Sequence, residues 1–210
     1  MPTLLLVCGT TAAAAAFFAC LDGWYLLRMP LTYLYARWML PRISDPLQEQ
    51  HFHSWVLPSD LDLLVHMNNA RYPREADMAR CVYLVRCGLF QSIGNLGGHT
   101  MLAASCCRFR RSLRLLEHFT IRTRIRGWDQ RAFYLEQRFV SARDGFVCAV
   151  LLVRQHVSGT TPGTALEQAC KRKMESPALS EEIQHWVRYN EASSQSLRRE
   201  SDIQEKSKAP

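Results

Sequence analysis

Residues 73–87 constrain the fold of this chain more than any other stretch, because they predict a helix that is apolar over most of its surface. Its apolar positions recur near helical spacing and comprise Ala76, Met78, Ala79, Cys81, Val82, Tyr83 and Val85. Proline is tolerated only in the first turn of a helix, so Pro73 limits where it starts, with Asn68 or Asn69 as the N-cap and Gly88 as a stop. A helix with so little polar surface must be enclosed, and a curved sheet is the expected enclosure.

Strand-like runs on both sides of this helix can supply that sheet. One run precedes the helix and four follow it, at residues 51–57, 99–108, 119–128, 132–141 and 146–156. Residues 119–126 alternate between apolar and polar side chains, which is typical of a strand with one buried face. The order of the runs predicts an α+β fold in which an antiparallel sheet, with its last four strands as a meander, wraps around a central helix.

Residues 1–27 predict a hydrophobic membrane segment. Residues 4–21 carry no charge, and a bilayer span needs about 18 to 20 apolar residues. Arg28 and Arg37 follow this run and no basic residue precedes it, which predicts an uncleaved signal-anchor with a cytosolic body in the endoplasmic reticulum membrane. A cleaved signal peptide and secretion are the alternative. Residues 28–50 predict an interfacial helix and a linker.

Charge and cysteine content narrow the range of partners. The net charge of +7 is compatible with nucleic acid, membrane headgroups or a phosphate-rich ligand. The chain has no dense Lys/Arg tract with stacking aromatic residues, so nucleic acid is not expected. The eight cysteines include no Cys-x-x-Cys, and His51 and His53 have no third ligand nearby in the sequence. We therefore expect no metal ion and no other cofactor.

The candidate site lies where the first strand gives way to the helix. Its centre is Asp62-Leu63-Leu64-Val65-His66-Met67-Asn68-Asn69-Ala70-Arg71-Tyr72, inside the polar stretch 58–80. Few purely structural segments are this polar at such a junction. The structural alternative is that Asp60 or Asp62 caps a turn and that His66 packs as a neutral core residue.

Residues 51–157 resemble the hot-dog fold thioesterases of the 4-hydroxybenzoyl-CoA and acyl-ACP thioesterase kind. In that family the pattern Asp-x-x-Gly-His-Val-Asn-Asn-x-x-Tyr joins a strand to the central helix, and the segment from Asp62 to Tyr72 matches it in order. The resemblance implies a homodimer made by joining two sheets edge to edge, with sites between the subunits. It also implies that acyl-CoA or a related thioester is the substrate. The family glycine before the histidine is Val65 here, which reshapes the approach of a ligand to the backbone.

The same resemblance assigns roles to residues. Asp62 corresponds to the nucleophile or general base of the aspartate-type enzymes, and substrate binding is implied for His66, Asn68, Asn69 and Tyr72. Backbone N–H groups at the start of the central helix would polarise the thioester carbonyl, because a helix N-terminus favours negative charge.

Arginines near the end of the second strand form a further candidate site. Arg108 and Arg111, clustered with Arg110 and Arg114, could bind the phosphates of coenzyme A. A solvated edge or a contact with anionic lipid is the alternative.

The last part of the chain predicts an extension to a hot-dog domain at residues 51–158. Residues 159–210 are expected to hold one helix at 180–200 and a disordered end at 201–210. The predicted function is a membrane-anchored acyl-CoA thioesterase. A catalytically inactive protein that binds acyl-CoA, or a scaffold of lipid metabolism, is the alternative.

Overall fold

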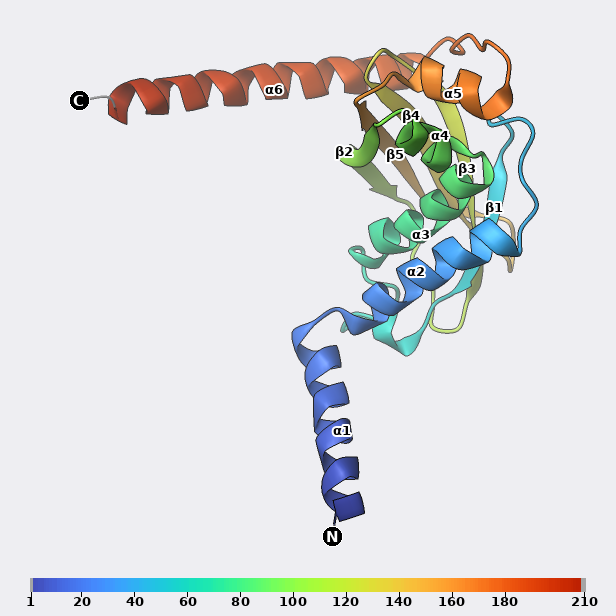
Figure 1. The fold of residues 1–210 in the computed structure, drawn as a ribbon, viewed down its shortest axis with the longest axis vertical. Coiled ribbons are helices and arrows are strands. Elements are labelled where there is room, and N and C mark those ends of the chain that lie inside the picture. Colours follow the sequence, from blue (N-terminus) through green and yellow to red (C-terminus); the bar gives the residue numbers. More distant parts are fainter. Residues whose placement is uncertain (1, 209–210) are drawn as a thin grey trace.

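The core of the molecule is a five-stranded antiparallel sheet wrapped around one helix, and the computed structural model describes residues 2–208 of the chain (Figure 1). The strands are β1 (Gln50–Trp55), β2 (His99–Phe109), β3 (His118–Trp128), β4 (Ala132–Ser141) and β5 (Val147–Ser158). Their bounds agree with the predicted runs to within two residues. Helix α3 (Arg71–Arg86) packs against the sheet, which confirms the predicted α+β fold.

The order of strands in the sheet is β1-β3-β4-β5-β2, so the prediction of a four-strand meander was wrong. Only β3, β4 and β5 form a meander. Strand β2 pairs with β5 instead of β3, from His99 opposite Ser158 to Phe109 opposite Ala149. The segment between β1 and β2 carries the chain across the sheet to its far edge. Either edge of the meander β3-β4-β5 can accept a further strand. The sequence order of the strands does not distinguish between them.

Helix α3 is enclosed as its composition predicts, since ten of its 16 residues are buried. Ala76 and Ala79 pack in one core cluster with Phe119 and Phe139 of the sheet. These small side chains let helix and sheet approach each other closely at interior packing density.

The two ends of α3 differ in how well they were predicted. The N-cap is Ala70, which makes no side-chain cap, whereas Asn68 Oδ1 accepts a hydrogen bond from Ala70 N at 2.9 Å. The N-cap prediction at Asn68 or Asn69 was therefore displaced by one or two residues. Gly88 does follow the end of α3, with a φ of 71°, and it also forms the N-cap of an unpredicted short helix, α4 (Leu89–Asn95).

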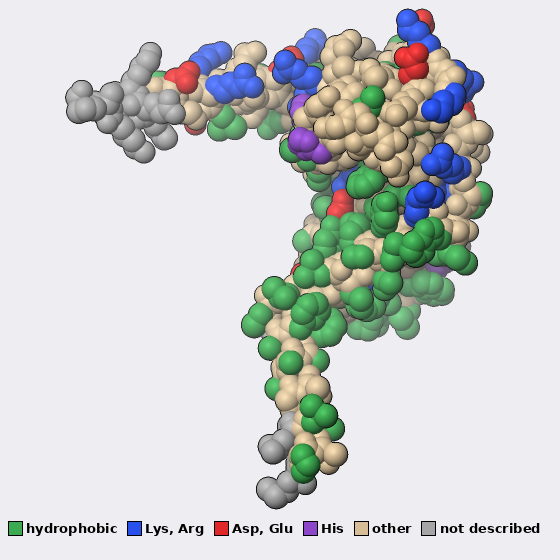
Figure 2. Space-filling view, in the orientation of Figure 1, with side chains coloured by type: hydrophobic (Ala, Val, Ile, Leu, Met, Phe, Trp, Pro, Cys, Tyr) green, Lys and Arg blue, Asp and Glu red, His purple; other side chains and the backbone are tan. Residues whose placement is uncertain are grey.

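The N-terminal segment forms two helices that meet at a corner. Helix α1 (Pro2–Cys20) stands away from the domain, whereas α2 (Gly23–Trp38) packs along α3, and Figure 2 shows hydrophobic side chains along both. Asp22 forms the corner, because its Oδ1 accepts from Tyr25 N at 3.3 Å and from Arg74 Nη2 at 2.6 Å. Among the described residues no single helix has the length and hydropathy to cross a membrane. The pair Gly9–Phe18 and Gly23–Trp38, bent by 81°, meets that test by length and composition only.

The C-terminal extension contains two helices. Helix α5 (Pro162–Cys170) begins at Thr161, whose Oγ1 accepts from Thr164 N at 3.2 Å. Helix α6 (Glu181–Lys208) packs its buried Ile183 near Tyr134 and then projects from the domain (Figure 1). It runs past the predicted end at residue 200, through most of the stretch expected to be disordered. Residues 209 and 210, also part of that expectation, lie outside the described residues.

Candidate active site

The segment from Asp62 to Met67 forms a tight reverse turn ahead of α3. Two backbone hydrogen bonds of 3.0 Å close it, from Val65 N to Asp62 O and from Asp62 N to His66 O. Val65 has a φ of 59°, in the left-handed region that favours glycine. The turn needs this conformation at the position where the thioesterase pattern has glycine, so the chain keeps the backbone shape despite the substitution.

Asp62 uses its two carboxylate oxygens differently. Oδ1 accepts a hydrogen bond from Leu64 N at 2.9 Å, so Asp62 does cap its own turn. Oδ2 lies 3.3 Å from His66 Nδ1, and the two side chains are each about a quarter exposed. His66 Nδ1 is buried and completes no hydrogen bond with any described residue. The 3.3 Å contact is therefore close but lacks hydrogen-bond geometry, so Asp62 Oδ2 and His66 Nδ1 each lack a hydrogen bond to a described residue.

Asn68 and Tyr72 of the motif make hydrogen bonds within the protein, and Asn69 lies on the surface. Asn68 is bonded to Ala70 N, and Asn69 is exposed at the start of α3. Tyr72 is only 1% exposed, and its hydroxyl accepts from Leu113 N at 3.2 Å. Burial raises the pKa of Tyr72 to about 12. The structure thus brings Asp62 and His66 together and places Tyr72 in the core, where it ties α3 to the chain at Leu113.

Asp60 has a structural role. It is 5% exposed, and its Oδ2 accepts from Leu57 N at 2.9 Å across the short turn η1 (Pro58–Asp60). Arg71 Nε lies 3.9 Å from its Oδ1. Of the two aspartates ahead of α3, Asp62 is therefore the one with a carboxylate oxygen that accepts no hydrogen bond from a described residue.

The predicted coenzyme A arginines divide into paired and unpaired side chains. Arg111 makes a bidentate ion pair with Asp144, at 2.7 and 2.8 Å, and lies over the ring of Phe146. The hydrogen bonds from Arg111 hold the pKa of Asp144 well below its usual value. Arg108 is exposed at the end of β2 and forms no ion pair within the described part of the chain.

Arg114 lies beside the candidate site. Its backbone forms an isolated antiparallel bridge with His66, so the two loops run side by side. Its side chain is exposed and makes no ion pair with another described residue. Sequence spacing could not single it out from its neighbours, because the bridge joins segments almost fifty positions apart.

A trough runs along α3 from its first turn. One cavity of 540 Å³ includes Pro73 and Arg74, and a second of 430 Å³ includes Leu84. The two cavities share Asp77, Arg80, Thr100 and Gln155. The apolar lining of the second cavity comes mainly from α2 and α3 and comprises Met29, Pro30, Tyr33, Leu34, Cys81, Leu84 and Phe90.

A charged network inside this trough was missed at the level of sequence. Asp77 accepts hydrogen bonds from Tyr25 of α2 and from Arg80. Arg80 is 4% exposed and also donates to Gln137 at 3.0 Å. Glu75, also on α3, is 2% exposed and forms a separate ion pair with Arg28 of α2. The signal that could have found the network is the presence of charged residues on an otherwise apolar central helix.

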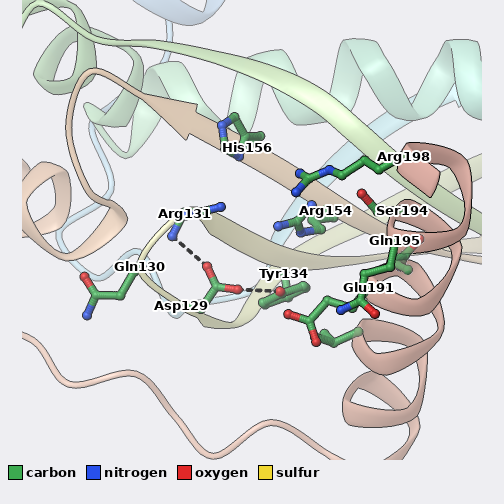
Figure 3. A pocket seen from close by; sticks show the side chains of 12 residues that line it. Asp129, Gln130, Arg131, Tyr134, Arg154, His156, Glu191, Ser194, Gln195 and Arg198 are labelled. Atoms are coloured by element: carbon green, nitrogen blue, oxygen red, sulfur yellow. Dashed lines mark hydrogen bonds between the residues drawn. The ribbon is translucent and has the colours of Figure 1, made fainter. Parts of the chain in front are cut away.

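Another cavity, of 590 Å³, lies under α6 and away from the motif. It lies beside β4 and β5, and Arg154, His156 and Arg198 contribute to its lining (Figure 3). Asp129 Oδ2 accepts from Tyr134 OH at 2.6 Å in this cavity. None of the sequence-predicted site residues lines it, and the described residues contain no group of three or more His, Cys, Asp or Glu side chains that could hold a metal ion.

The fold and the turn at Asp62 define the class of the protein as a hot-dog thioesterase fold. Two solved structures share it: a gentisyl-coenzyme A thioesterase (TM-score 0.51, 22% identity, 59% of this chain and 100% of that one) and a probable thioesterase from Escherichia coli (0.52, 21%, 57% and 94%). The sequence pattern of the thioesterase-like superfamily matches residues 56–187. The chain belongs to this superfamily.

Three relatives are similar to this chain over two thirds of its length or more. The chain is 52% identical to Protein THEM6 of Xenopus laevis, over 92% of this chain and 93% of the relative. It is 48% identical to Protein THEM6 of Danio rerio, over 91% and 94%, and 36% identical to that of Drosophila melanogaster, over 67% and 73%.

Proposed function

We propose that the chain is a membrane-anchored thioesterase that hydrolyses fatty acyl-CoA. The observation that carries the proposal is the pair formed by Asp62 and His66, whose Oδ2 and Nδ1 are 3.3 Å apart in a turn directly ahead of the central helix. The gentisyl-coenzyme A thioesterase that shares the fold acts on a coenzyme A thioester, which supports the same substrate class here.

The proposed chemistry uses the free oxygen of Asp62. This carboxylate takes a proton from the attacking water, or itself attacks the carbonyl carbon to form an acyl anhydride that water then hydrolyses, and His66 orients the water or the carboxylate. In both routes the C–S bond breaks, and coenzyme A leaves as a thiolate that takes up the proton released by the water. Backbone N–H groups at the start of α3 stabilise the oxyanion, because the helix N-terminus is the positive end of its dipole. Ala70 N donates to Asn68 Oδ1, Arg71 N donates to Asn68 O, and Pro73 has no N–H, so among residues 70–73 the N–H of Tyr72 carries this role.

We propose the trough along α3 as the site of the acyl chain. Its mouth includes Pro73 and Arg74 in the turn of α3 that follows the Asp62 loop, and its far part is apolar around Tyr33 and Phe90. Apolar cavities with a few polar groups at one end are the usual form of sites for small ligands. Arg108 and Arg114 are the arginines with side chains available for the coenzyme A phosphates.

A panel of acyl-CoA substrates with the substitution Asp62→Asn tests the proposal. An asparagine Oδ1 still accepts from Leu64 N, so the turn is kept while the base is removed. Turnover by the full chain in lipid nanodiscs should fall by about 100-fold or more, as expected for loss of a general base. The matched control is Asp202→Asn on the exposed outer part of α6, which should leave turnover unchanged. Equal turnover by Asp62→Asn and the wild type would remove Asp62 from the mechanism.

A non-catalytic acyl-CoA-binding protein is the second candidate. It is favoured by the same apolar trough and by the poor alignment of His66 with Asp62. Saturable binding of acyl-CoA by the wild type, with no turnover at any chain length, would select it. A scaffold that acts through α6 would instead keep its cellular effect in Asp62→Asn and lose it when residues 180–210 are deleted.

For the location, we propose the endoplasmic reticulum membrane, with α1 as anchor and the domain in the cytosol. The uncharged run at 4–21 and the arginines that follow it support this orientation. Protease added to sealed microsomes should digest the domain. A protected domain would reverse the topology, and recovery of a shortened chain from the medium would indicate signal cleavage and secretion.

We further propose a homodimer through β2, since active sites that lie between subunits would need it. Strand β2 is paired on one side only and is exposed along most of its 11 residues, including Met101 and Leu102. Long, exposed edge strands are suited to pairing with another strand.

A further inference from the structure

Two adjacent loops present apolar side chains to solvent beside the candidate site. Leu63 is 100% exposed, Leu64 76% and Val65 64%, and in the second loop Leu116 is 62% and Leu115 39% exposed. Single exposed apolar residues are common on protein surfaces, but five on two neighbouring loops are not.

The two loops are held next to each other by backbone contacts. His66 and Arg114 form an antiparallel bridge, and Met67 N donates to Leu113 O at 2.9 Å. Each loop also holds one apolar residue in the left-handed region, Val65 at a φ of 59° and Leu116 at 58°. The left-handed conformation is strained for valine and leucine. The fold therefore keeps a conformation that costs free energy and that points these two side chains outward.

The loops lie at the end of the domain from which α1 departs. Asp22, at the start of α2, is bonded to Arg74 in the first turn of α3, and the loop at 61–67 leads into that same turn. Figure 2 shows hydrophobic side chains gathered over this end of the domain, along α2 and below it.

Helix α2 adds an apolar stripe to the same surface. Its exposed large residues include Trp24, Leu27, Leu31, Tyr35 and Trp38. Their spacing of three or four residues places them on one face, opposite the face that packs on α3. The 81° bend between the helices sets α2 nearly perpendicular to α1, so α2 would lie along a bilayer surface that α1 enters.

Basic side chains accompany the exposed leucines. Arg114 precedes Leu115 in the second loop and is exposed. Arg143, with a side chain 52% exposed, shares a cavity of 420 Å³ with Leu115 and Leu116. Apolar tips flanked by arginine match the layering of a membrane, where acyl chains lie beneath anionic headgroups.

We infer that the loop tips at residues 63–65 and 115–116 insert into the bilayer, so that the Asp62–His66 site opens at the membrane surface. Asp62 and His66 immediately flank the inserted residues 63–65. The substrate class is then an acyl thioester whose long chain is already dissolved in the bilayer, which enters the site without crossing water. This inference rests on the proposed thioesterase function and names where that function finds its substrate.

Lipid contact can be measured without relying on turnover. A fluorescent amino acid with environment-sensitive emission is placed at position 64 of the full chain, in vesicles of phosphatidylcholine and phosphatidylserine with or without brominated acyl chains. The matched control carries the same residue in place of Leu197 on α6, which is 60% exposed. We expect blue-shifted emission and quenching by brominated lipid at position 64, and neither at position 197.

The outcomes separate the alternatives. Blue-shifted emission at position 64 without bromine quenching would overturn the inference and indicate that a second copy of the chain covers the loops. Emission typical of water at both positions would also overturn it. Either result leaves the proposed function standing, because that function is decided by the Asp62→Asn assay.

Substrate selection gives the second readout. The double substitution Leu63→Ser and Leu64→Ser should lower kcat/KM for a long-chain acyl-CoA presented in vesicles by about tenfold relative to a short-chain, water-soluble one, because insertion scales with buried apolar area. Leu197→Ser with Ile203→Ser, also exposed, is the control that should change neither rate. An unchanged ratio of the two substrates in the loop variant contradicts the inference.

Discussion

Position 65 shows how one residue can keep a family's backbone while departing from its sequence. Val65 adopts a φ of 59° and closes the turn that presents Asp62. A β-branched residue is disfavoured there by clashes of its Cβ with the backbone, which glycine lacks. The strain is tolerated because hydrogen bonds on both sides of the residue fix the turn.

Replacing Val65 with glycine should therefore stabilise the fold. We expect Val65→Gly to raise the free energy of unfolding by about 0.5–1 kcal/mol, the relief of left-handed strain less the added entropy of the unfolded chain. Urea unfolding of the full chain in nanodiscs, followed by circular dichroism, measures it. Leu64→Gly is the matched control, since Leu64 is also exposed, at 76% against 64% for Val65, but has no positive φ, and it should lose stability. Equal effects of both changes would refute the strain argument.

Glu136 on β4 gives a residue-scale prediction about pH. It is 6% exposed and lies within 3.5 Å of Arg124, Arg126 and Arg138. Burial alone would raise its pKa, but hydrogen bonds from Arg138 and Arg124 outweigh burial and hold the pKa below 4.5. A depressed folded-state pKa means that its contribution to stability is complete above pH 4.5 and is lost as the pH falls through the folded pKa.

Glu136→Gln should accordingly destabilise the fold at neutral pH and much less in acid. The expected loss at pH 7 is about 1–2 kcal/mol, below that of a fully buried pair because the three arginines are partly exposed and screened. Urea midpoints at several pH values test this, and the difference from wild type should shrink below pH 4.5. Glu182→Gln, exposed on α6, should show no such trend. A difference independent of pH would contradict the ion-pair explanation.

At the scale of elements, α2 is fixed to α3 by charge rather than by apolar contact alone. Arg28 donates two hydrogen bonds to Glu75, at 2.5 and 3.0 Å, and Ser54 of β1 donates a third at 3.0 Å. Glu75 is 2% exposed, so its carboxylate depends on these partners. The apolar face of α2 is thereby left free to point outward.

Arg28→Met should detach α2 from the domain. Removing one partner of a buried ion pair costs about 3–5 kcal/mol when the other charge stays buried, and we expect the lower end because Arg28 is 21% exposed. Hydrogen–deuterium exchange should speed up across residues 23–38. Arg37→Met on the same helix is the control, since Arg37 is exposed and should leave exchange unchanged. Exchange that is equally slow in all three proteins would show that α2 is held by other contacts.

The elements were predictable from sequence where local pattern decides them, and less so where distant contacts do. Alternation and turn residues located all five strands, and the apolar surface of residues 73–87 required an enclosing sheet. The pairing of β2 with β5 was missed because both edges of the meander accept a strand. The long α6 was cut short because its polar outer half carries no periodic apolar signal.

The candidate site was predictable in part for the same reason. Asp62 and His66 come together because only the three residues of one turn, 63–65, lie between them. The burial of Tyr72, the pairing of Arg111 with Asp144 and the nearness of Arg114 to His66 depend on segments far apart in the chain. Pattern alone does not encode such contacts.

At the scale of the whole molecule, the free edge of β2 predicts the assembly. Met101→Glu with Leu102→Glu places charges on the exposed strand and should convert the proposed dimer into a monomer, because like charges then face each other across the interface. Light scattering of the full chain in detergent, corrected for bound detergent, measures the protein mass. Leu197→Glu with Ile203→Glu is the control and should keep the dimer. A wild-type chain that is already monomeric would exclude this assembly.

The corner at Asp22 has a consequence for how a molecule placed on the proposed membrane would meet its substrate. A domain held by a single helix can rotate and tilt about that helix. Helices α1 and α2 are set 81° apart and define a plane, and Asp22 between them is bonded to Arg74 of α3, so the domain is fixed relative to that plane. The domain would then keep one orientation relative to the bilayer. Protein and acyl chain would then meet by lateral diffusion in the plane of the bilayer. The domain would not need to reorient before it binds the chain, and capture would not depend on collision from solution.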